Sequence, residues 1–242
     1  MSDTLIERII NKLEADSSLS SRASSNCRRC FGVQMRLVER GGETIAEHCL
    51  CLRRLIAKAQ LALIPPVFGK PKLSQLRPRI DLHPKQDSVV EFVRYHSNDS
   101  YLLLGRNGVG KSHIAWAIFR HVLASRRPAV ACTVRDLISD FRKVETEAAP
   151  EGWTPRITAD HLRKPGKKWL IFLDEFEKAR PSEFASEQLF HLLDAAKSFN
   201  HQIVVTSNMR ASELRSHWGR IDEVYGNSIL TRLNDCHLIE LF

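Results

Sequence analysis

The sequence contains no apolar run close to the ~18 residues that a membrane-spanning helix needs. The best candidate, residues 55–68, is interrupted by Lys58, Gln60 and two prolines. The N-terminal segment MSDTLIERIINKLEADS is acidic and amphipathic, and it lacks the charged and then apolar layout of a signal peptide. We therefore expect a cytoplasmic protein without a membrane partner.

Aromatic residues make up only 7% of the sequence, and few of them stand among basic residues. This shortage of rings for base stacking gives no support to sequence-specific recognition of a nucleic acid. The 36 lysines and arginines still exceed the 28 acidic residues, and the net charge of +8 favours a polyanionic partner. We expect salt-sensitive DNA binding without sequence specificity. The basic residues form three groups: Arg53, Arg54 and Lys58; Lys70, Lys72, Arg77 and Arg79; and Arg163, Lys164, Lys167 and Lys168.

Four of the six cysteines lie within 25 residues, as the pairs Cys27 and Cys30, and Cys49 and Cys51. The segment between the pairs predicts two strands joined by a glycine-glycine turn. Such a hairpin can bring four thiolates together around a tetrahedral Zn²⁺ ion. The second pair is spaced more tightly than is usual, which keeps His48 as an alternative ligand. Unpaired buried thiols are the other interpretation, and the two remaining cysteines are expected in the core.

Composition and residue pattern divide the chain into three predicted parts. Residues 1–64 hold an amphipathic helix and the zinc-ribbon-like module, which is too small to fold without its metal. Residues 65–88 carry five prolines and several basic residues, which is typical of a linker on the surface. Residues 89–242 alternate between strand-like and helix-like segments and form the largest predicted domain.

Four short segments of this last part are rich in Val, Ile, Leu and Phe, which predicts buried parallel strands. Segments with helical periodicity lie between them. The alternating order predicts an α/β domain with a parallel sheet and right-handed crossovers. The predicted strands are 100–105, 129–134, 169–174 and 202–208, and the predicted helices are 112–125, 134–145 and 186–199.

Residues 102–113, LLLGRNGVGKSH, contain the pattern G-x-x-x-x-G-K-[ST] without deviation. Its glycines allow successive backbone N–H groups to point at phosphate oxygens. Lys111 supplies charge for the β- and γ-phosphates, Ser112 a hydroxyl for Mg²⁺, and the following helix its positive end. A chance match is the alternative, but the flanking strand and helix provide the context that the motif requires. We predict that ATP is bound by Gly105, Arg106, Asn107, Gly108, Val109, Gly110, Lys111, Ser112 and His113.

Two adjacent carboxylates follow the third predicted strand. Asp174 is expected to hold Mg²⁺ together with Ser112, and Glu175 to orient or deprotonate the attacking water. An acidic start of a helix is the alternative. The pair favours ATP hydrolysis over a kinase or a switch GTPase, and the sequence has no NKxD motif for guanine and no dinucleotide G-x-G-x-x-G motif.

The fourth predicted strand ends in the polar residues Thr206, Ser207 and Asn208. Asn208 is the candidate sensor between the carboxylates and the γ-phosphate, and its two neighbours are candidates to share this task. Polar capping of a strand end is the alternative interpretation.

The segments GRNGVGKS, LIFLDE, VVTSNM and GNSILTRLND occur in this order over residues 100–242. The chain thereby resembles the AAA+ ATPases of the DnaC and DnaI type of bacterial helicase loader, with the IstB-type helpers of transposition as close relatives. The resemblance implies a P-loop (AAA+/ASCE) domain that assembles into a homo-oligomeric ring or spiral with ATP at the interfaces. In these families a basic residue of the final segment reaches into the neighbouring subunit's ATP site. The matching position is Arg232, with Arg220 as the second candidate.

The resemblance also bears on the lid, the zinc module and the partner. The sequence ends ten residues after Arg232, so we expect no C-terminal helical lid, as in the short loader and IstB-type members. Some DnaI-type loaders carry an N-terminal zinc module that docks on the helicase, which IstB-type proteins are not expected to have. The resemblance therefore favours an ATP-dependent loader of a replicative DNA helicase. The alternative is an IstB-like ATPase that binds DNA and recruits a transposase; a nucleotide-gated adaptor without hydrolysis is disfavoured by Glu175.

Overall fold

The computed structural model describes residues 27–31, 35–40, 43–125, 127–146, 155–164, 168–220 and 225–242. The predicted N-terminal amphipathic helix and Lys167 lie outside these residues. The chain divides into two compact units, residues 1–65 with 151–154 and residues 66–150 with 155–242. Among the described helices, none is long and apolar enough to cross a membrane.

The first unit contains a two-stranded hairpin followed by a helix. Strands β1 (Met35–Arg40) and β2 (Glu43–His48) pair in antiparallel register, from Met35 opposite His48 to Arg40 opposite Glu43. The pairing confirms the predicted hairpin. Helix α3 (Leu50–Leu61) begins directly after Cys49, so the second cysteine pair spans the start of a helix.

The second unit is built on a five-stranded parallel sheet with the strand order β4-β5-β6-β3-β7. The sheet confirms the predicted α/β fold with parallel strands. The edge strand β7 was not predicted from the sequence. The strands are β3 (Tyr101–Gly105), β4 (Ala129–Thr133), β5 (Leu170–Asp174), β6 (Gln202–Ser207) and β7 (His237–Leu241).

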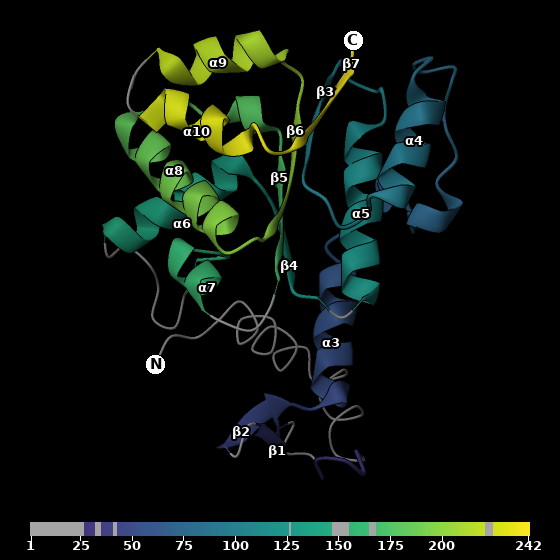
Figure 1. Ribbon diagram of the computed structural model, residues 1–242, viewed down its shortest axis with the longest axis vertical. Coiled ribbons are helices and arrows are strands. Elements are labelled where there is room, and N and C mark those ends of the chain that lie inside the picture. The colour runs from purple at the N-terminus through teal and green to yellow at the C-terminus, as the bar shows by residue number, and fades with distance from the viewer. Residues whose placement is uncertain are drawn as a thin grey trace. The chain divides into compact units, whose positions relative to one another are not determined.

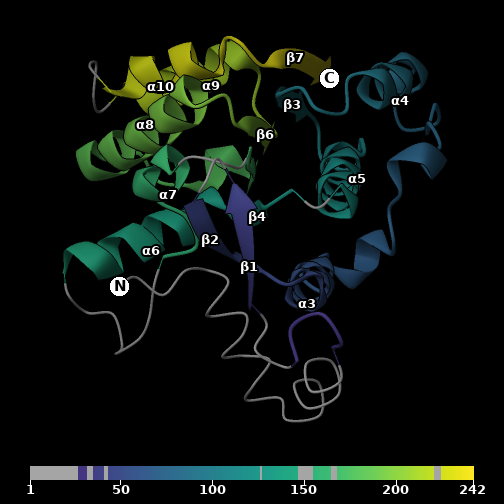
Figure 2. The same ribbon diagram turned by 60° about the horizontal axis from the view of Figure 1, so that its bottom comes forward.

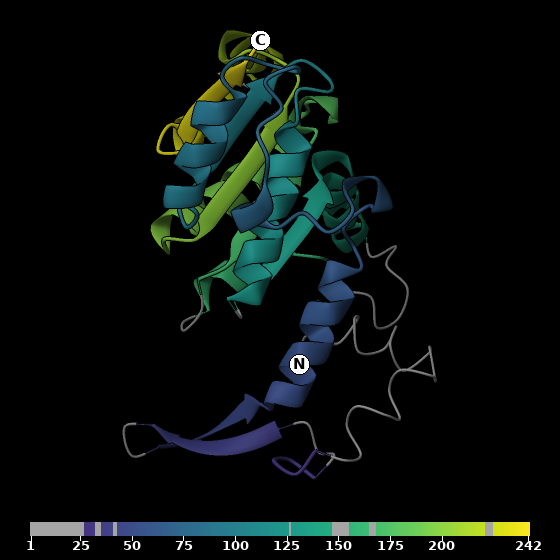
Figure 3. The same cartoon turned by 90° about the vertical axis from the view of Figure 1, so that its right-hand side faces the viewer.

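Helices cover both faces of this sheet (Figures 1 and 2). Helices α4 (Gln86–Tyr95) and α5 (Lys111–Ala124) lie over one face, and Figure 3 shows both in front of the strands. The other face is covered by α6 (Val134–Glu145), α7 (Ala159–Arg163), α8 (Glu183–Ser198), α9 (Ala211–Gly219) and α10 (Tyr225–Leu233).

The segment before α4 packs as part of the second unit. It forms two short 3₁₀ turns, Pro66–Phe68 and Leu73–Gln75, and it buries the side chains of Leu73 and Leu76. Burial of two leucines is worth several kcal/mol at about 1.5–3 kcal/mol each. These apolar anchors hold the proline-rich segment against the ATPase fold.

The carboxyl ends of β3, β5 and β6 meet at one edge of the sheet, because the three strands are adjacent and parallel. The strands themselves are almost entirely buried, as expected for a sheet covered on both faces. Each of the three is followed at once by one of the motifs singled out in the sequence. The fold therefore brings these motifs together at a single edge.

Gly105 ends β3 at a place where the backbone of β7 passes very close. A Cβ added at this position would lie 2.4 Å from the Leu241 carbonyl oxygen. We expect Gly105→Ala to lower the free energy of unfolding by about 1–3 kcal/mol or more, because backbone must shift to make room. Chemical denaturation measures this loss. Gly69→Ala is the control, since an added Cβ there has nothing within 4 Å and the cost is only that of its left-handed φ of 61°, about 1–2 kcal/mol. A loss in Gly105→Ala no larger than in this control would contradict the steric explanation.

Candidate nucleotide-binding site and cysteine cluster

A polar cavity of about 180 Å³ lies at the carboxyl edge of the sheet. It is lined by the phosphate loop, by the two acidic residues after β5 and by the end of β6. The lining residues are Asn107, Gly108, Gly110, Lys111, Ser112, Asp174, Glu175, Thr206, Ser207 and Asn208. Of the residues predicted to bind ATP, Gly105, Arg106, Val109 and His113 lie outside this lining, and His113 instead faces the ring of Phe68 at 6.2 Å.

The phosphate loop takes the backbone conformation that its glycines allow. Gly108 and Gly110 have left-handed φ values of 82° and 93°, and Gly110 is the N-cap of α5. The side chain of the buried Gln86 donates a hydrogen bond to the Val109 carbonyl and supports the loop from behind. The N-terminus of α5 thus begins at the cavity, where its free N–H groups and positive end suit a phosphate group.

Lys111 lies inside the cavity and is held by three oxygens. Its ammonium donates to the carbonyls of Gly105 and Arg106, both at 2.8 Å, and to Asn208 Oδ1 at 2.9 Å. Burial lowers the pKa of Lys111, while the nearby carboxylates of Glu177 and Asp174 oppose this shift. All three N–H groups of the ammonium are thus engaged by protein oxygens, so a phosphate contact requires that the lysine release one of these partners.

Asp174 is the centre of an oxygen-rich cluster beside the loop. Its Oδ1 accepts hydrogen bonds from the Ser112 hydroxyl at 3.2 Å, from the Thr206 hydroxyl, and from the Glu175 N–H at 3.2 Å. A carboxylate and a serine hydroxyl in contact are the hard oxygen donors that Mg²⁺ prefers. The residues fit a magnesium ion bound to nucleotide phosphates at this point.

Two glutamates follow the end of β5 and differ in their surroundings. Glu175 has a left-handed φ of 55° and forms an ion pair with Lys178. Glu177 accepts a hydrogen bond from Asn208 Nδ2 at 2.5 Å, and its Oε2 is buried without a partner among the described residues. Sequence reasoning missed Glu177. Its only signal was a third carboxylate two residues after Glu175, and its contact with Asn208 depends on the tertiary fold.

Arg232 lies at the opposite edge of the sheet from the phosphate loop. It lines a cavity with Ser100 and His237, which stand at the amino ends of β3 and β7. Its Nε donates to Asp194 on α8 at 2.7 Å, and its guanidinium lies 5.0 Å from the centroid of the Phe190 ring. The five-residue strand β3 separates this edge from the phosphate loop by about 16 Å. One chain therefore does not bring its own Arg232 to its own loop.

Arg220, the second candidate, is exposed at the C-terminal end of α9. It lines a separate cavity of about 460 Å³ with Met209, which directly follows Asn208. Arg220 therefore stands on the same side of the fold as the phosphate loop, unlike Arg232.

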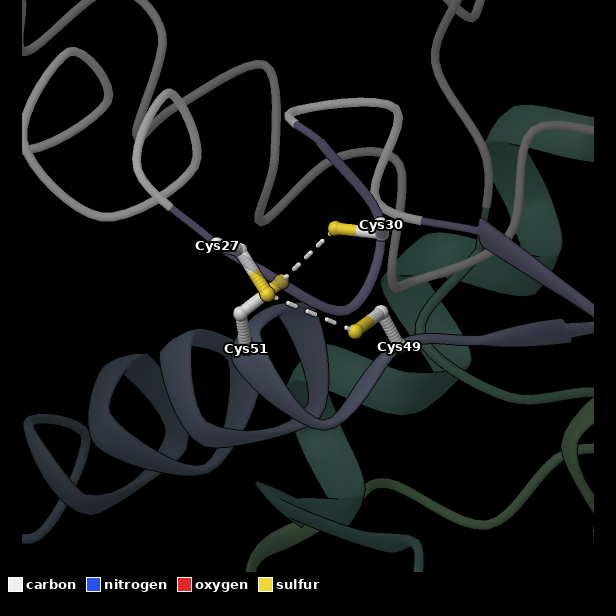
Figure 4. A group of neighbouring side chains, drawn as sticks. All are labelled: Cys27, Cys30, Cys49 and Cys51. Carbon is white, nitrogen blue, oxygen red and sulfur yellow. Dashed lines mark hydrogen bonds between the residues drawn. The ribbon is translucent and has the colours of Figure 1, made fainter.

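The four N-terminal cysteines come together in the first unit (Figure 4). The sulfurs of Cys27 and Cys49 are 3.8 Å apart, and those of Cys30 and Cys51 are 3.5 Å apart. A tetrahedral zinc site with Zn–S bonds of ~2.3 Å requires sulfurs about 3.8 Å apart. The geometry fits one zinc ion held by four thiolates. The side chain of His48, the alternative ligand, lies outside the described part of the chain.

The predicted basic groups differ in their partners. Arg79 pairs with Asp81 at 2.7 Å and Arg163 with Asp160 at 2.8 Å, so these two arginines are already neutralised locally. The structure describes no side chain for Arg53 and Arg54. The remaining described basic residues of the three groups have exposed side chains and form no ion pair among the described residues. They are Lys58, Lys70, Lys72, Arg77, Lys164 and Lys168.

The fold and the site define a P-loop ATPase: a glycine-rich loop between strand β3 and helix α5, an acidic pair at the end of β5, and a parallel sheet in which β6 lies between these two strands. The family model of the IstB-like ATP binding protein matches residues 82–241. The chain belongs to this family of ATP-binding proteins.

The curated relatives match the ATPase part of the chain. The ATP-binding protein of insertion sequence IS5376 from Geobacillus stearothermophilus is 28% identical over 138 residues, which is 56% of this chain and 49% of that protein. The chromosomal replication initiator protein DnaA of Helicobacter hepaticus is 24% identical over 143 residues, which is 54% of this chain and 29% of that protein. The matches thus span half or less of the length of these relatives.

Solved structures share the fold at low sequence identity. The DnaC helicase loader superposes with a TM-score of 0.52 and 16% identity, over 74% of this chain and 100% of that chain. The structure of DnaI gives a TM-score of 0.54 and 18% identity, over 74% of this chain and 92% of that chain. This likeness confirms the P-loop ATPase fold.

Proposed function

We propose that the chain hydrolyses ATP in the cavity at the carboxyl edge of the sheet. The observation that carries this proposal is the convergence of Lys111, Asp174, Glu175 and Asn208 on one cavity. Lys111 and the backbone of the loop bind the phosphates, and Asp174 and Ser112 hold Mg²⁺, which neutralises phosphate charge. Asn208 accepts a hydrogen bond from Lys111 and donates one to Glu177, and in this proposal it senses the terminal phosphate.

In this proposal Glu175 orients or deprotonates the attacking water. In the structure its carboxylate is held by Lys178, which is not among the residues that line the cavity. Its backbone N–H donates to Asp174 Oδ1 and to Thr206 Oγ1, both at 3.2 Å, so the main chain at this position is fixed. For Glu175 to act on the water, its side chain must leave Lys178 and turn toward the cavity.

Glu175→Gln should lower kcat about 10²–10⁴-fold, as expected for the loss of a general base, while leaving ATP affinity unchanged. Glu177→Gln is the matched control. Because Glu177 acts through Asn208, its loss should change kcat less than that of Glu175. Steady-state ATPase kinetics and equilibrium nucleotide binding measure both. A larger loss of kcat in Glu177→Gln would assign the role of base to Glu177 and contradict the proposal.

The active site is completed by a second copy of the chain. Arg232 lies at the edge opposite its own phosphate loop, with its guanidinium held by Asp194 and Phe190. Within the described residues, its two terminal nitrogens have no hydrogen-bond partner. A guanidinium presented in this way can stabilise the charge on a phosphate of a neighbouring molecule. ATP binding thereby favours a homo-oligomeric ring or spiral with ATP at the interfaces.

The partner that we favour is a replicative DNA helicase, which this protein would load on DNA. The specific feature behind this choice is the four-cysteine module that precedes the ATPase unit in the sequence, since some DnaI-type loaders resemble the chain in this respect. ATP binding would build the oligomer, the zinc-bound module would grip the helicase, and hydrolysis would release it. The exposed lysines and Arg77 would give weak, salt-sensitive contacts with DNA phosphates.

A transposition ATPase is the second candidate. The family match over residues 82–241 and the relative from insertion sequence IS5376 favour it. In this role the ATP-bound oligomer would coat DNA and recruit a transposase.

Purified partners separate the two candidates. The full chain, with ATP and Mg²⁺, is passed over size-exclusion columns with the replicative helicase of the same organism and, separately, with a transposase encoded beside it. Comigration with the helicase, lost in a Cys27→Ser/Cys30→Ser variant that still binds ATP, is the expected result. Comigration with the transposase alone would overturn the loader assignment and leave the ATPase assignment intact.

A further inference from the structure

A second cluster of metal-binding side chains lies in the ATPase unit, away from the nucleotide cavity. His96 follows α4, Asp99 lies in the turn before β3, and His237 begins β7. One nitrogen of each histidine and a carboxylate oxygen of Asp99 lie within 4.8 Å of one another. We propose that this histidine–aspartate cluster binds a divalent transition-metal ion of the Zn²⁺ type.

The distances in the cluster are close to those of a metal site. Asp99 Oδ2 is 3.1 Å from His96 Nδ1 and 3.0 Å from His237 Nε2. Tetrahedral zinc with bonds of ~2.0–2.1 Å places its ligand atoms about 3.3 Å apart. A metal ion can therefore replace the protons that Asp99 shares with the two histidines with movements of a few tenths of an ångström at these two pairs. The two histidine nitrogens lie within 4.8 Å of each other. Each histidine would bind as the neutral imidazole, with its proton on the other nitrogen.

The surrounding residues hold the ligands in place. The Phe92 ring stacks on His96 with ring centroids 4.5 Å apart, and it meets the His237 ring edge-on at 5.0 Å. The fully buried Gln202 donates a hydrogen bond of 2.7 Å to the Asp99 carbonyl. Both rings and the aspartate backbone are thus positioned before any ion binds, which lowers the cost of binding.

The cluster has an open side, unlike the cysteine cluster. Its side chains are 42–46% exposed, and Asp99 and His237 line a polar cavity of about 260 Å³. Imidazole nitrogen suits zinc, copper, iron and nickel, whereas magnesium and calcium take oxygen ligands, so the two histidines favour an ion of the first group. With three protein ligands, a bound ion would keep a further position for water.

The same contacts would also serve as a hydrogen-bonded link between α4 and β7 without any metal, and Zn²⁺ titration distinguishes the two. The full chain is titrated without nucleotide by equilibrium dialysis. The wild type should bind one Zn²⁺ equivalent more than His237→Ala and Asp99→Asn do, at micromolar affinity. This difference does not depend on the cysteine cluster, because all three proteins retain it. Zn²⁺ should also raise the melting temperature of the wild type by a few degrees more than that of the variants.

His191→Ala is the matched control. His191 is another half-exposed histidine beside a carboxylate, 3.8 Å from Glu187, without a third ligand among the described residues. It should bind as much Zn²⁺ as the wild type. Unchanged ATP affinity shows that the variants fold. Equal Zn²⁺ uptake by the wild type, His237→Ala and Asp99→Asn would overturn the proposal, and so would an equal loss in His191→Ala, which would indicate general surface binding.

Discussion

Replacing Arg232 by alanine is expected to lower the ATPase turnover about 10³-fold or more while leaving the affinity for ATP unchanged. An arginine supplied in trans typically contributes 10³–10⁵ to the rate of phosphoryl transfer. The side chain stands at the amino edge of the sheet, across β3 from its own phosphate loop. Its loss therefore removes nothing from the binding cavity of the same chain. Equilibrium nucleotide binding tests the unchanged affinity, and steady-state ATPase kinetics on the same preparation test the lowered turnover.

A mixing experiment tests whether the arginine acts between molecules. Lys111→Ala abolishes the phosphate contact but retains Arg232, whereas Arg232→Ala retains the complete cavity. Each variant should be nearly inactive alone. A mixture should recover activity, because the intact cavity of one chain then meets the intact arginine of the other. No recovery in a mixture that assembles would contradict action in trans.

Arg220→Ala is the control for this experiment. Arg220 lies near Met209 on the side of the phosphate loop, so it is the residue that one chain could use in its own site. It should change turnover far less than Arg232→Ala. If Arg220→Ala lowers turnover more than Arg232→Ala does, Arg220 is the arginine that acts on the phosphates.

The phosphate loop and its flanking elements could be predicted from the sequence because the residues that define them are consecutive in the chain. The predicted strand and helix around the loop agree with β3 and α5 within one residue at each end. Helix α6 begins at Val134 and ends at Glu145, as its apolar periodicity predicted. Parallel strands buried on both faces carry long apolar runs, and such runs are hard to miss.

Other elements carried weaker signals. Strand β7 is exposed at its first two residues, His237 and Leu238, and carries Glu240 further on, so it lacks a continuous apolar run. Helix α4 begins at Gln86, inside a segment whose prolines predicted a linker. The buried Gln86 side chain hydrogen-bonds to the phosphate loop, and the local sequence around Gln86 does not predict this contact.

The same distinction applies to the candidate site. Lys111, Asp174 and Glu175 belong to short motifs and could be named at once. The link from Lys111 through Asn208 to Glu177 joins three separate segments of the chain. Likewise, the pairing of Arg232 with Asp194 joins α10 to α8, and only the fold brings these helices together. Motifs predict which residues react, whereas the contacts that position them come from tertiary structure.

The second large effect is expected in the N-terminal module. Removing zinc with a chelator, or replacing Cys49 by serine, should unfold the hairpin β1–β2 and helix α3. Among the described residues of this unit, the buried aliphatic side chains are Leu52 and Ile64, while Phe31 and Leu37 are 85% and 74% exposed. Two such side chains contribute a few kcal/mol, against about 1–2 kcal/mol of backbone entropy for each ordered residue. Structural zinc contributes ~10–16 kcal/mol and reverses this balance.

The expected results are one cysteine-bound zinc per chain, a loss of helical circular dichroism on chelation, and cleavage of residues 27–61 by protease. ATP binding should persist, because the P-loop residues belong to the other unit. Cys132→Ser and Cys236→Ser are the controls. Burial raises the pKa of both thiols to about 12, so they stay protonated and are poor metal ligands.

These controls should keep the zinc content and the protease resistance of the wild type. Zinc retained in Cys49→Ser, with the module still resistant to protease, would contradict a four-thiolate site. In that case a variant lacking His48 as well would show whether the histidine has taken the place of the missing thiolate. A module that stays folded in the complete absence of metal would refute the structural role of zinc altogether, since its few buried side chains would then have sufficed.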